Sequence, residues 1–277
     1  MNATPLTAHH AELIEFPEAM SAGERHVGRA QNFSVDWIGH TQPHVADSAH
    51  ELLLLLPGAG ARIEHGTSTT AAPGRSFCII PAGRCTITLE APALGILIAS
   101  SRNDLGSSDY LNERTRDSRI VASTPAFRRR SGEGKPLVTA IDDIAAPADN
   151  ARLKMYQTDT LSINWVEYDG PRDRAKLSPH SHDDFEQGSL AIEGRFMHHL
   201  RTPWGSNADQ WRDDEHLAAA PRSLLVIPPG LIHTTEGVGA GYHLLIDIFS
   251  PPRRDFIAKG WIANAADYED PTRPAAS

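Results

Sequence analysis

The segment KLSPHSHDDFEQGSLAIEG, Lys176 to Gly194, decides how the rest of the chain is interpreted. Its second half alternates apolar and small polar residues and ends in a turn-forming glycine, which is typical of a β-strand. Successive side chains of a strand point to opposite faces, so His180 and His182 face the same side. Two imidazoles on one face, followed by Glu186 and Gln187, indicate a metal site rather than a polar turn that happens to contain histidines.

A further donor lies downstream, where His233 follows the turn Pro228-Pro229-Gly230 at the start of another expected strand. Imidazole nitrogens with a carboxylate or amide oxygen suit first-row transition metals and form a poor cage for Ca²⁺. Any one of these histidines alone could be an ordinary hydrogen-bonded side chain. The three together, each beside a turn motif, favour metal binding.

Length and charge narrow the class of protein. With 277 residues and 40% hydrophobic content, the chain suits one large or two ordinary globular domains. A formal net charge of -9 argues against nucleic acid or an anionic membrane as the main partner, so we expect a small-molecule substrate. The N-terminal stretch does not resemble a secretory signal, and the apolar run 52–56 is too short to cross a bilayer, so we expect a cytoplasmic protein.

Glycine and proline are scattered through the chain and separate short β-rich runs such as FCIIPAG, LSINWVEY and SLLVIPPG. This spacing predicts an all-β sandwich or barrel. Helix is expected only in short pieces, around Ala8 to Phe16, Asp104 to Arg114 and Arg253 to Trp261. The two cysteines are too few for a disulfide framework.

An internal repeat supports two copies of one β unit. APGRSFCIIPAGRCTITLE and APRSLLVIPPGLIHTTEG share an Arg-Ser opening, an apolar strand and a Pro-x-Gly turn. The stretch between the copies is rich in charge, proline, glycine and alanine, as in a linker. The predicted domains are an N-terminal barrel over residues 1–118, a linker over 119–152 and a C-terminal barrel over 153–277.

The C-terminal half resembles the cupin superfamily, whose two signatures are G(X)5HXH(X)3,4E(X)6G and G(X)5PXG(X)2H(X)3N. The first is matched by His180-Ser181-His182, four residues, Gln187, six residues and Gly194, and the second by Pro228-Pro229-Gly230, two residues and His233. The resemblance implies two double-stranded β-helix (jelly-roll) barrels in tandem, a bicupin. It also implies one divalent transition metal per chain, Fe(II) favoured and Mn, Ni or Zn as alternatives, held by His180, His182, Gln187 and His233.

Three positions depart from the cupin pattern. The glycine expected six positions before the first histidine is missing, and the asparagine expected after the last is Gly237. The third ligand is ambiguous, because a gap of four residues after His182 reaches Gln187 and a gap of three reaches Glu186. Strand parity admits only one of the two. We favour Gln187, since some cupins use a glutamine oxygen there, and keep Glu186 as the alternative.

The first half resembles the same barrel with its metal site eroded. It retains the Pro81-Ala82-Gly83 turn, but Thr86 occupies the position that corresponds to His233. Upstream, His44, His50 and Glu51 form no His-x-His pair. We therefore expect an N-terminal barrel with a structural role.

Candidates for the pocket wall lie on strands that flank the motifs: Trp165, Phe196, His198, Trp204, Tyr242 and Asp247. At most one of the adjacent His198 and His199 can point inward. Trp204 belongs to the long segment Arg201 to Ser223, for which a lid over the site and a packed surface excursion are the two alternatives.

A metal held by three or four protein ligands keeps positions open for substrate. The similarity to two-barrel cupins implies, first, an Fe(II) dioxygenase that cleaves an aromatic or dicarbonyl substrate. With Zn, Mn or Ni the same site supports a Lewis-acid isomerase, lyase or decarboxylase acting on a sugar acid or enolisable carbonyl. A non-catalytic small-molecule-binding barrel is the third alternative. Pairing through edge strands would make the protein a homodimer.

Overall fold

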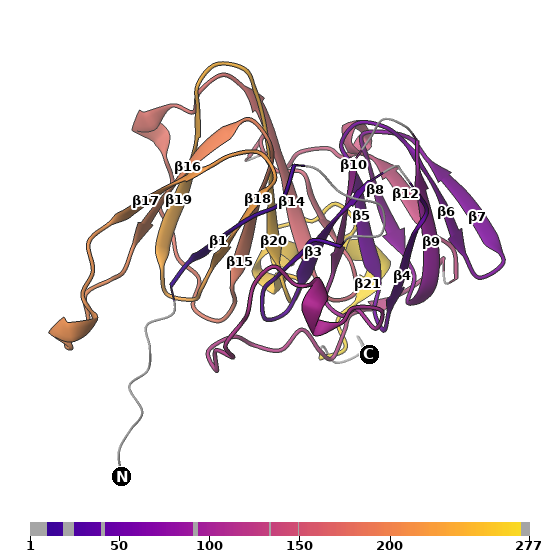
Figure 1. The fold of residues 1–277 in the computed structure, drawn as a ribbon, viewed down its shortest axis with the longest axis horizontal. Helices are drawn as coiled ribbons and strands as arrows, with labels where there is room; N and C mark the ends of the chain where they lie inside the picture. The colour runs from indigo at the N-terminus through magenta and orange to yellow at the C-terminus, as the bar shows by residue number, and fades with distance from the viewer. Residues whose placement is uncertain are drawn as a thin grey trace, which may run out of the picture.

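The computed structural model describes residues 10–18, 25–39, 42–90, 94–132, 134–148 and 150–272. Regular structure in these residues is almost entirely antiparallel β, arranged as two barrels side by side (Figure 1). The predicted all-β fold with two jelly-roll barrels is confirmed. Within the same residues, no helix combines the length and apolar character needed to cross a bilayer.

The N-terminal barrel pairs a six-stranded sheet, β12-β8-β5-β10-β3-β2, with a four-stranded sheet, β4-β9-β6-β7. Its strands are β2 (Val27–Arg29), β3 (Ser34–Gly39), β4 (His44–Ser48), β5 (Leu52–Leu56), β6 (Ala61–His65), β7 (Ser68–Ala72), β8 (Ser76–Ile80), β9 (Gly83–Leu89), β10 (Leu94–Ala99) and β12 (Leu137–Ala140). Apolar side chains from both sheets, including Leu54, Ile63 and Ile87, fill its interior.

The C-terminal barrel pairs a six-stranded sheet, β1-β18-β15-β20-β14-β13, with a three-stranded sheet, β17-β16-β19. Its strands are β1 (Glu12–Glu15), β13 (Met155–Gln157), β14 (Ser162–Asp169), β15 (Gln187–Glu193), β16 (Arg195–Arg201), β17 (Glu215–Ala219), β18 (Ser223–Ile227), β19 (Ile232–Val238) and β20 (Tyr242–Phe249). An isolated antiparallel bridge between His180 and His233 extends the smaller sheet.

The repeat seen in the sequence corresponds to the same turn in both barrels. Arg75 and Arg222 precede β8 and β18 with φ of 54° and 65°, a left-handed conformation that is uncommon outside glycine. The next residue closes each turn, because the Ser76 and Ser223 hydroxyls donate to carbonyls three residues earlier. The repeated Arg-Ser opening therefore starts equivalent strands.

The largest apolar core lies between the two six-stranded sheets rather than inside either barrel. Trp37, Leu55 and Phe77 of the N-terminal barrel pack in it with Trp165 and Ile246 of the C-terminal barrel. Both faces of each large sheet are therefore buried. This explains the unbroken leucine run of β5, whose residues alternate between the core shared by the barrels and the barrel interior.

The predicted helix at Ala8 to Phe16 is wrong over its described residues. Residues Glu12–Glu15 form β1, which pairs antiparallel with β18 of the C-terminal barrel (Figure 1). Ile14 and Phe16 are buried in the core between the barrels, whereas Glu15 is exposed. The alternation of a short strand can be mistaken for one helical turn, and pairing with β18 decides between them.

The other two predicted helices are shorter than expected. Asp104 to Arg114 contains only the single 3-10 turn η1 (Ser107–Asp109), followed by an irregular stretch. The segment Arg253 to Trp261 contains the short helix α1 (Arg254–Ala258), as predicted.

Strand pairing crosses the predicted domain limits. Within the expected linker, β12 pairs with β8 of the N-terminal barrel, and β11 (Arg128–Arg129) pairs with β21 (Tyr268–Glu269) near the C-terminus. At the other end, β1 joins the C-terminal barrel. The limits 118 and 152 stay a prediction, and no simple cut of the chain there separates the two barrels.

Candidate metal centre and its cavity

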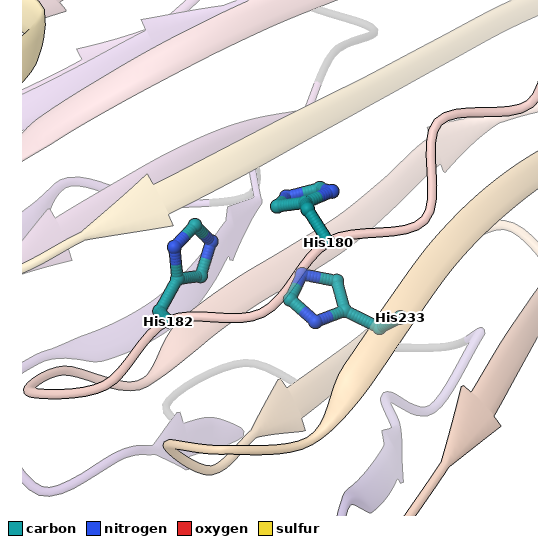
Figure 2. A group of neighbouring side chains, drawn as sticks. All are labelled: His180, His182 and His233. Carbon is teal, nitrogen blue, oxygen red and sulfur yellow. The ribbon is translucent and has the colours of Figure 1, made fainter. Parts of the chain in front are cut away.

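Three histidines from two segments converge at one end of the C-terminal barrel. His180 and His182 lie in the loop before β15, His233 lies near the start of β19, and their rings point toward one another (Figure 2). One nitrogen from each lies within 4.8 Å of the others. The backbone fixes this arrangement, because the His180 N–H donates to the His233 carbonyl at 3.0 Å and the His233 N–H donates back at 2.8 Å.

Hydrogen bonds to the backbone select the tautomer of two of these rings. Nδ1 of His233 lies 3.0 Å from the Leu231 carbonyl oxygen, and Nδ1 of His180 lies 2.9 Å from that of Ser178. A carbonyl oxygen only accepts, so each Nδ1 carries the hydrogen. Nε2 of both rings is left with a lone pair available to a metal.

Strand parity separates the two candidates for the next ligand. Gln187, the first residue of β15, places Oε1 2.9 Å from Nε2 of His182 and 3.2 Å from Nε2 of His233. Glu186 points the opposite way, where its buried carboxylate pairs with Arg114. The structure therefore brings Gln187, and not Glu186, to the histidines.

The amide of Gln187 is oriented by a carboxylate behind it. Its Nε2 donates to Asp247 Oδ1 at 3.0 Å and to Ser189 Oγ at 3.2 Å, so Oε1 faces the histidines. Oε1 and the His233 Nε2 lone pair are then two acceptors 3.2 Å apart with no hydrogen between them. A cation bound by both atoms would remove the repulsion between the two acceptors. Three imidazoles with an amide oxygen form a donor set suited to a first-row transition metal.

Burial keeps the imidazoles of His182 and His233 neutral. Together with the neighbouring His180, it lowers the pKa of His182 to about 4 and that of His233 to about 3. A neutral ring is the form that binds a metal. Burial also raises the pKa of Asp247, although hydrogen bonds from Ser189 and other neighbours oppose that shift.

A cavity of about 380 Å³ opens beside the three histidines and Gln187. Its wall mixes apolar side chains such as Met155, Val166 and Phe249 with polar groups such as Asn164, Tyr168 and Asp247. A volume of this size is typical of a small-molecule site.

No protein-family model and no curated protein matches the chain. Solved structures do match its fold. AerE from Microcystis aeruginosa aligns with a TM-score of 0.53 and 9% identity over 88% of this chain and 94% of that one. A mutant of Bacillus subtilis oxalate decarboxylase gives 0.54 and 11% over 80% and 70%, and the coconut allergen cocosin gives 0.50 and 11% over 79% and 76%. The fold is that of a two-barrel cupin.

Of the residues predicted for the pocket wall, Asp247 lines the cavity. Trp165 and Tyr242 do not, because each lies on the outer face of its strand, toward the N-terminal barrel. The Trp165 ring packs edge-on against Phe77, with ring centroids 5.7 Å apart. The Tyr242 hydroxyl donates a hydrogen bond to the Glu167 carboxylate at 2.6 Å. Residues that alternate with Trp165 on β14 and with Tyr242 on β20 point inward instead. Asn164 and Asp247 are examples.

Phe196 and His198 point into the C-terminal barrel but lie outside the cavity wall. Phe196 packs in a small apolar cluster with Leu245. His198 is 1% exposed, and its Nδ1 lies 2.9 Å from the Thr235 hydroxyl. His199 points the other way, with Nε2 3.0 Å from a Glu236 carboxylate oxygen, so only one of the adjacent histidines faces inward, as parity requires.

The long segment Arg201 to Ser223 does not cover the cavity. None of its residues lines it, and the connection between β16 and β17 projects from the barrel at the lower left of Figure 1. Trp204 is 72% exposed and stacks on Trp211 with ring centroids 4.6 Å apart. The lid interpretation and the placement of Trp204 in the pocket are wrong for this structure, because β17 pairs with β16 and leads the connection outward.

Among its described residues, the N-terminal barrel has no comparable centre. Cys85, and not Thr86, is the buried residue at the start of β9, and it packs with Cys78 and other apolar side chains. His44 lies 3.3 Å from an Asp36 carboxylate oxygen instead of facing another histidine. In the described part of the chain, the three-histidine group is the only cluster of His, Cys, Asp or Glu with metal-ligand spacing.

The cavity also has a basic wall, which no sequence motif indicated. Arg152, Arg172 and Lys259 line it, and each lies in a loop or just after α1 rather than on a strand with a readable period. Only closure of the barrel brings these segments to the histidines.

Proposed function

We propose that this bicupin is a metal-dependent enzyme acting on a small organic molecule, with His180, His182, His233 and Gln187 as ligands of one divalent transition metal. The observation that carries the proposal is the pair of facing acceptors, Oε1 of Gln187 and Nε2 of His233, next to the two other imidazoles. The adjoining cavity supplies room for a substrate.

The donor set favours Lewis-acid chemistry. All four ligand side chains are neutral, whereas the oxygen-activating triad of many non-haem iron enzymes contains a carboxylate. A metal held by neutral ligands keeps its full charge and supplies polarisation of a bound carbonyl or carboxylate. Decarboxylase, lyase or isomerase activity is therefore our first proposal. The similarity of fold to Bacillus subtilis oxalate decarboxylase, another of whose structures concerns its Mn(II) centres, supports Mn(II) as a candidate.

Residues around the proposed metal would orient its amide ligand and exclude water. Asp247 and Ser189 hold the Gln187 amide, so its oxygen is directed before any metal binds. Phe249 and other apolar residues of the wall would exclude water from the reacting atoms.

An Fe(II) dioxygenase, which the resemblance in sequence favours, is the second candidate. The cavity supports it through its aromatic wall of Phe249, Phe256 and Trp261, which suits an aromatic or dicarbonyl substrate. The absence of a carboxylate from the proposed ligands places it behind the Lewis-acid reaction.

Metal analysis of protein purified without oxygen tests the proposal. We expect about one transition-metal ion per chain by mass spectrometry in the parent and loss of that ion in His233→Ala, which removes a ligand and leaves the sheets in place. Substrate conversion by the Mn(II) form without O2 would support the Lewis-acid reaction, and O2 uptake matched to substrate loss by the Fe(II) form would support the dioxygenase. A parent that takes up no Mn, Fe, Ni or Zn would overturn both.

A further inference from the structure

The cavity beside the histidines is strongly basic in a chain of net charge -9. Arg152, Arg172 and Lys259 line it, and Asp247 is the only acidic residue in its described wall. None of the three basic side chains forms an ion pair with a described residue. By contrast, the buried Arg102 is neutralised by Asp36 at 3.2 Å. The described wall of this cavity therefore carries an excess of positive charge.

Arg172 is held rigidly by neutral partners. Nη1 donates to the Thr235 carbonyl at 2.8 Å and Nη2 to the Ser178 hydroxyl at 3.2 Å. Its backbone N–H donates to the Gly237 carbonyl at 3.0 Å, which anchors the loop from the other side. The buried Nε–H has no hydrogen-bond partner among the described residues.

A half-buried guanidinium without a counter-ion is costly unless something else neutralises it. Burial, and then the nearby charge of Arg152, lower the pKa of Arg172, which shows that its surroundings disfavour the cation. Its planar set of N–H groups matches a carboxylate, which could accept two hydrogen bonds in parallel. Asp247 is engaged by Gln187 and Ser189 and does not pair with it.

We propose that the substrate is a small dicarboxylate, with one acidic group at the metal and the second bound by Arg172, assisted by Arg152 and Lys259. The apolar side chains of Met155 and Phe249 then face the carbon chain between the two acids. The assignment of the first acidic group rests on the proposed metal-dependent function. The second group's site rests on Arg172 and its contacts alone.

Calorimetry on the zinc-loaded protein tests this inference without turnover. Succinate and butyrate have the same number of carbons and differ by one carboxylate, so we expect succinate to bind at least ten times more tightly. In Arg172→Gln, succinate affinity should fall roughly ten-fold to a hundred-fold, the size of one charge-assisted interaction, while butyrate affinity stays within a factor of about three. Equal affinities of the parent for the two acids would overturn the proposal.

Further variants separate binding from loop stability. Arg152→Gln and Lys259→Gln change exposed side chains, of which that of Lys259 lies over the Trp261 ring at 4.3 Å. Each variant should weaken succinate more than butyrate. Arg212→Gln, in the projecting connection, is the matched control and should change neither. An equal loss of succinate affinity in Arg212→Gln would contradict the proposal. A parent that binds no zinc but binds succinate through Arg172 would refute the metal site and leave this subsite standing.

Discussion

Two adjacent side chains of this chain have different roles. Gln187 points into the barrel at His182 and His233, whereas Glu186 points out and accepts a hydrogen bond from the Asn32 backbone N–H at 3.2 Å. Glu186 is fully buried and pairs with Arg114, so it joins the C-terminal barrel to segments of the N-terminal half. A single step along a strand thus separates a candidate ligand from a structural ion pair.

Alanine substitutions at these two positions should therefore separate metal content from stability. Gln187→Ala should lower metal occupancy and reduce the free energy of unfolding by about 1–2 kcal/mol, because the buried Asp247 carboxylate loses a hydrogen-bond donor. Glu186→Ala should leave metal occupancy intact and reduce that free energy by about 3 kcal/mol, because it leaves the Arg114 charge without its partner. Metal analysis and urea unfolding of both variants check the pair. The opposite pattern would make Glu186 the ligand.

At the scale of elements, the first strand joins the N-terminal part of the chain to the C-terminal barrel. β1 precedes the whole N-terminal barrel in sequence but lies at the edge of the C-terminal barrel's large sheet, beside β18 (Figure 1). Its Ile14 is 5% exposed and packs into the core shared by both barrels. A short strand thereby contributes to both halves.

Ile14→Ala should lower the free energy of unfolding by roughly 2–5 kcal/mol, because it leaves a cavity in a packed core. Glu15→Ala, on the exposed face of the same strand, should change that energy by less than about 0.5 kcal/mol. Chemical denaturation followed by tryptophan fluorescence measures both variants. Similar small effects would mean that β1 is only loosely attached.

At the scale of the whole molecule, the two barrels share a core and are not independent. Their six-stranded sheets bury apolar faces against each other, and the C-terminal sheet takes β1 from the other end of the chain. Residues 153–277 produced alone should therefore lack cooperative unfolding and bind a hydrophobic dye, because they expose this face and lose a strand. A sharp thermal transition near that of the full chain would show the C-terminal barrel to be autonomous.

An ion-pair network between the barrels makes their association sensitive to acid. Burial raises the pKa of Glu167, but hydrogen bonds from Arg75, Tyr242 and Lys154 outweigh it and lower the value to about 2 from 4.5. Arg75 belongs to the N-terminal barrel and lies 3.1 Å from the Glu167 carboxylate. The folded-state pKa is depressed, so this stabilisation is complete above pH 4.5 and is lost as the pH falls toward 2.

Glu167→Gln should accordingly reduce the free energy of unfolding at pH 7 by about 1–2 kcal/mol, a figure that allows for solvent screening of this partly exposed group. The difference between variant and parent should shrink as the pH falls from 4.5 toward 2, where the parent's carboxylate becomes protonated. Thermal unfolding over that pH range measures it. A constant difference at every pH would indicate lost packing rather than lost charge.

Local spacing was enough to predict the candidate ligands. His180 and His182 are two residues apart and His233 follows a turn motif, and the three rings meet as expected. His180 and His182 lie in the loop before β15 rather than on a strand, and the backbone bridge between His180 and His233 holds them in place. Strand parity made Gln187 and Glu186 mutually exclusive. It could not say which was correct, because the register of β15 is set by pairing with β18 and β20.

Repeat, composition and motif spacing by themselves determined an all-β chain of two barrels and the three histidines of the centre, because turns and alternating strands are local properties. Tertiary structure alone decided that Trp165 faces the other barrel, that Trp204 lies outside the cavity wall and that Arg172 belongs to it. The reason is physical: a strand's period defines two faces but not which one is inward. Which face is inward depends on the partner sheet, and loop positions depend on where the barrel closes.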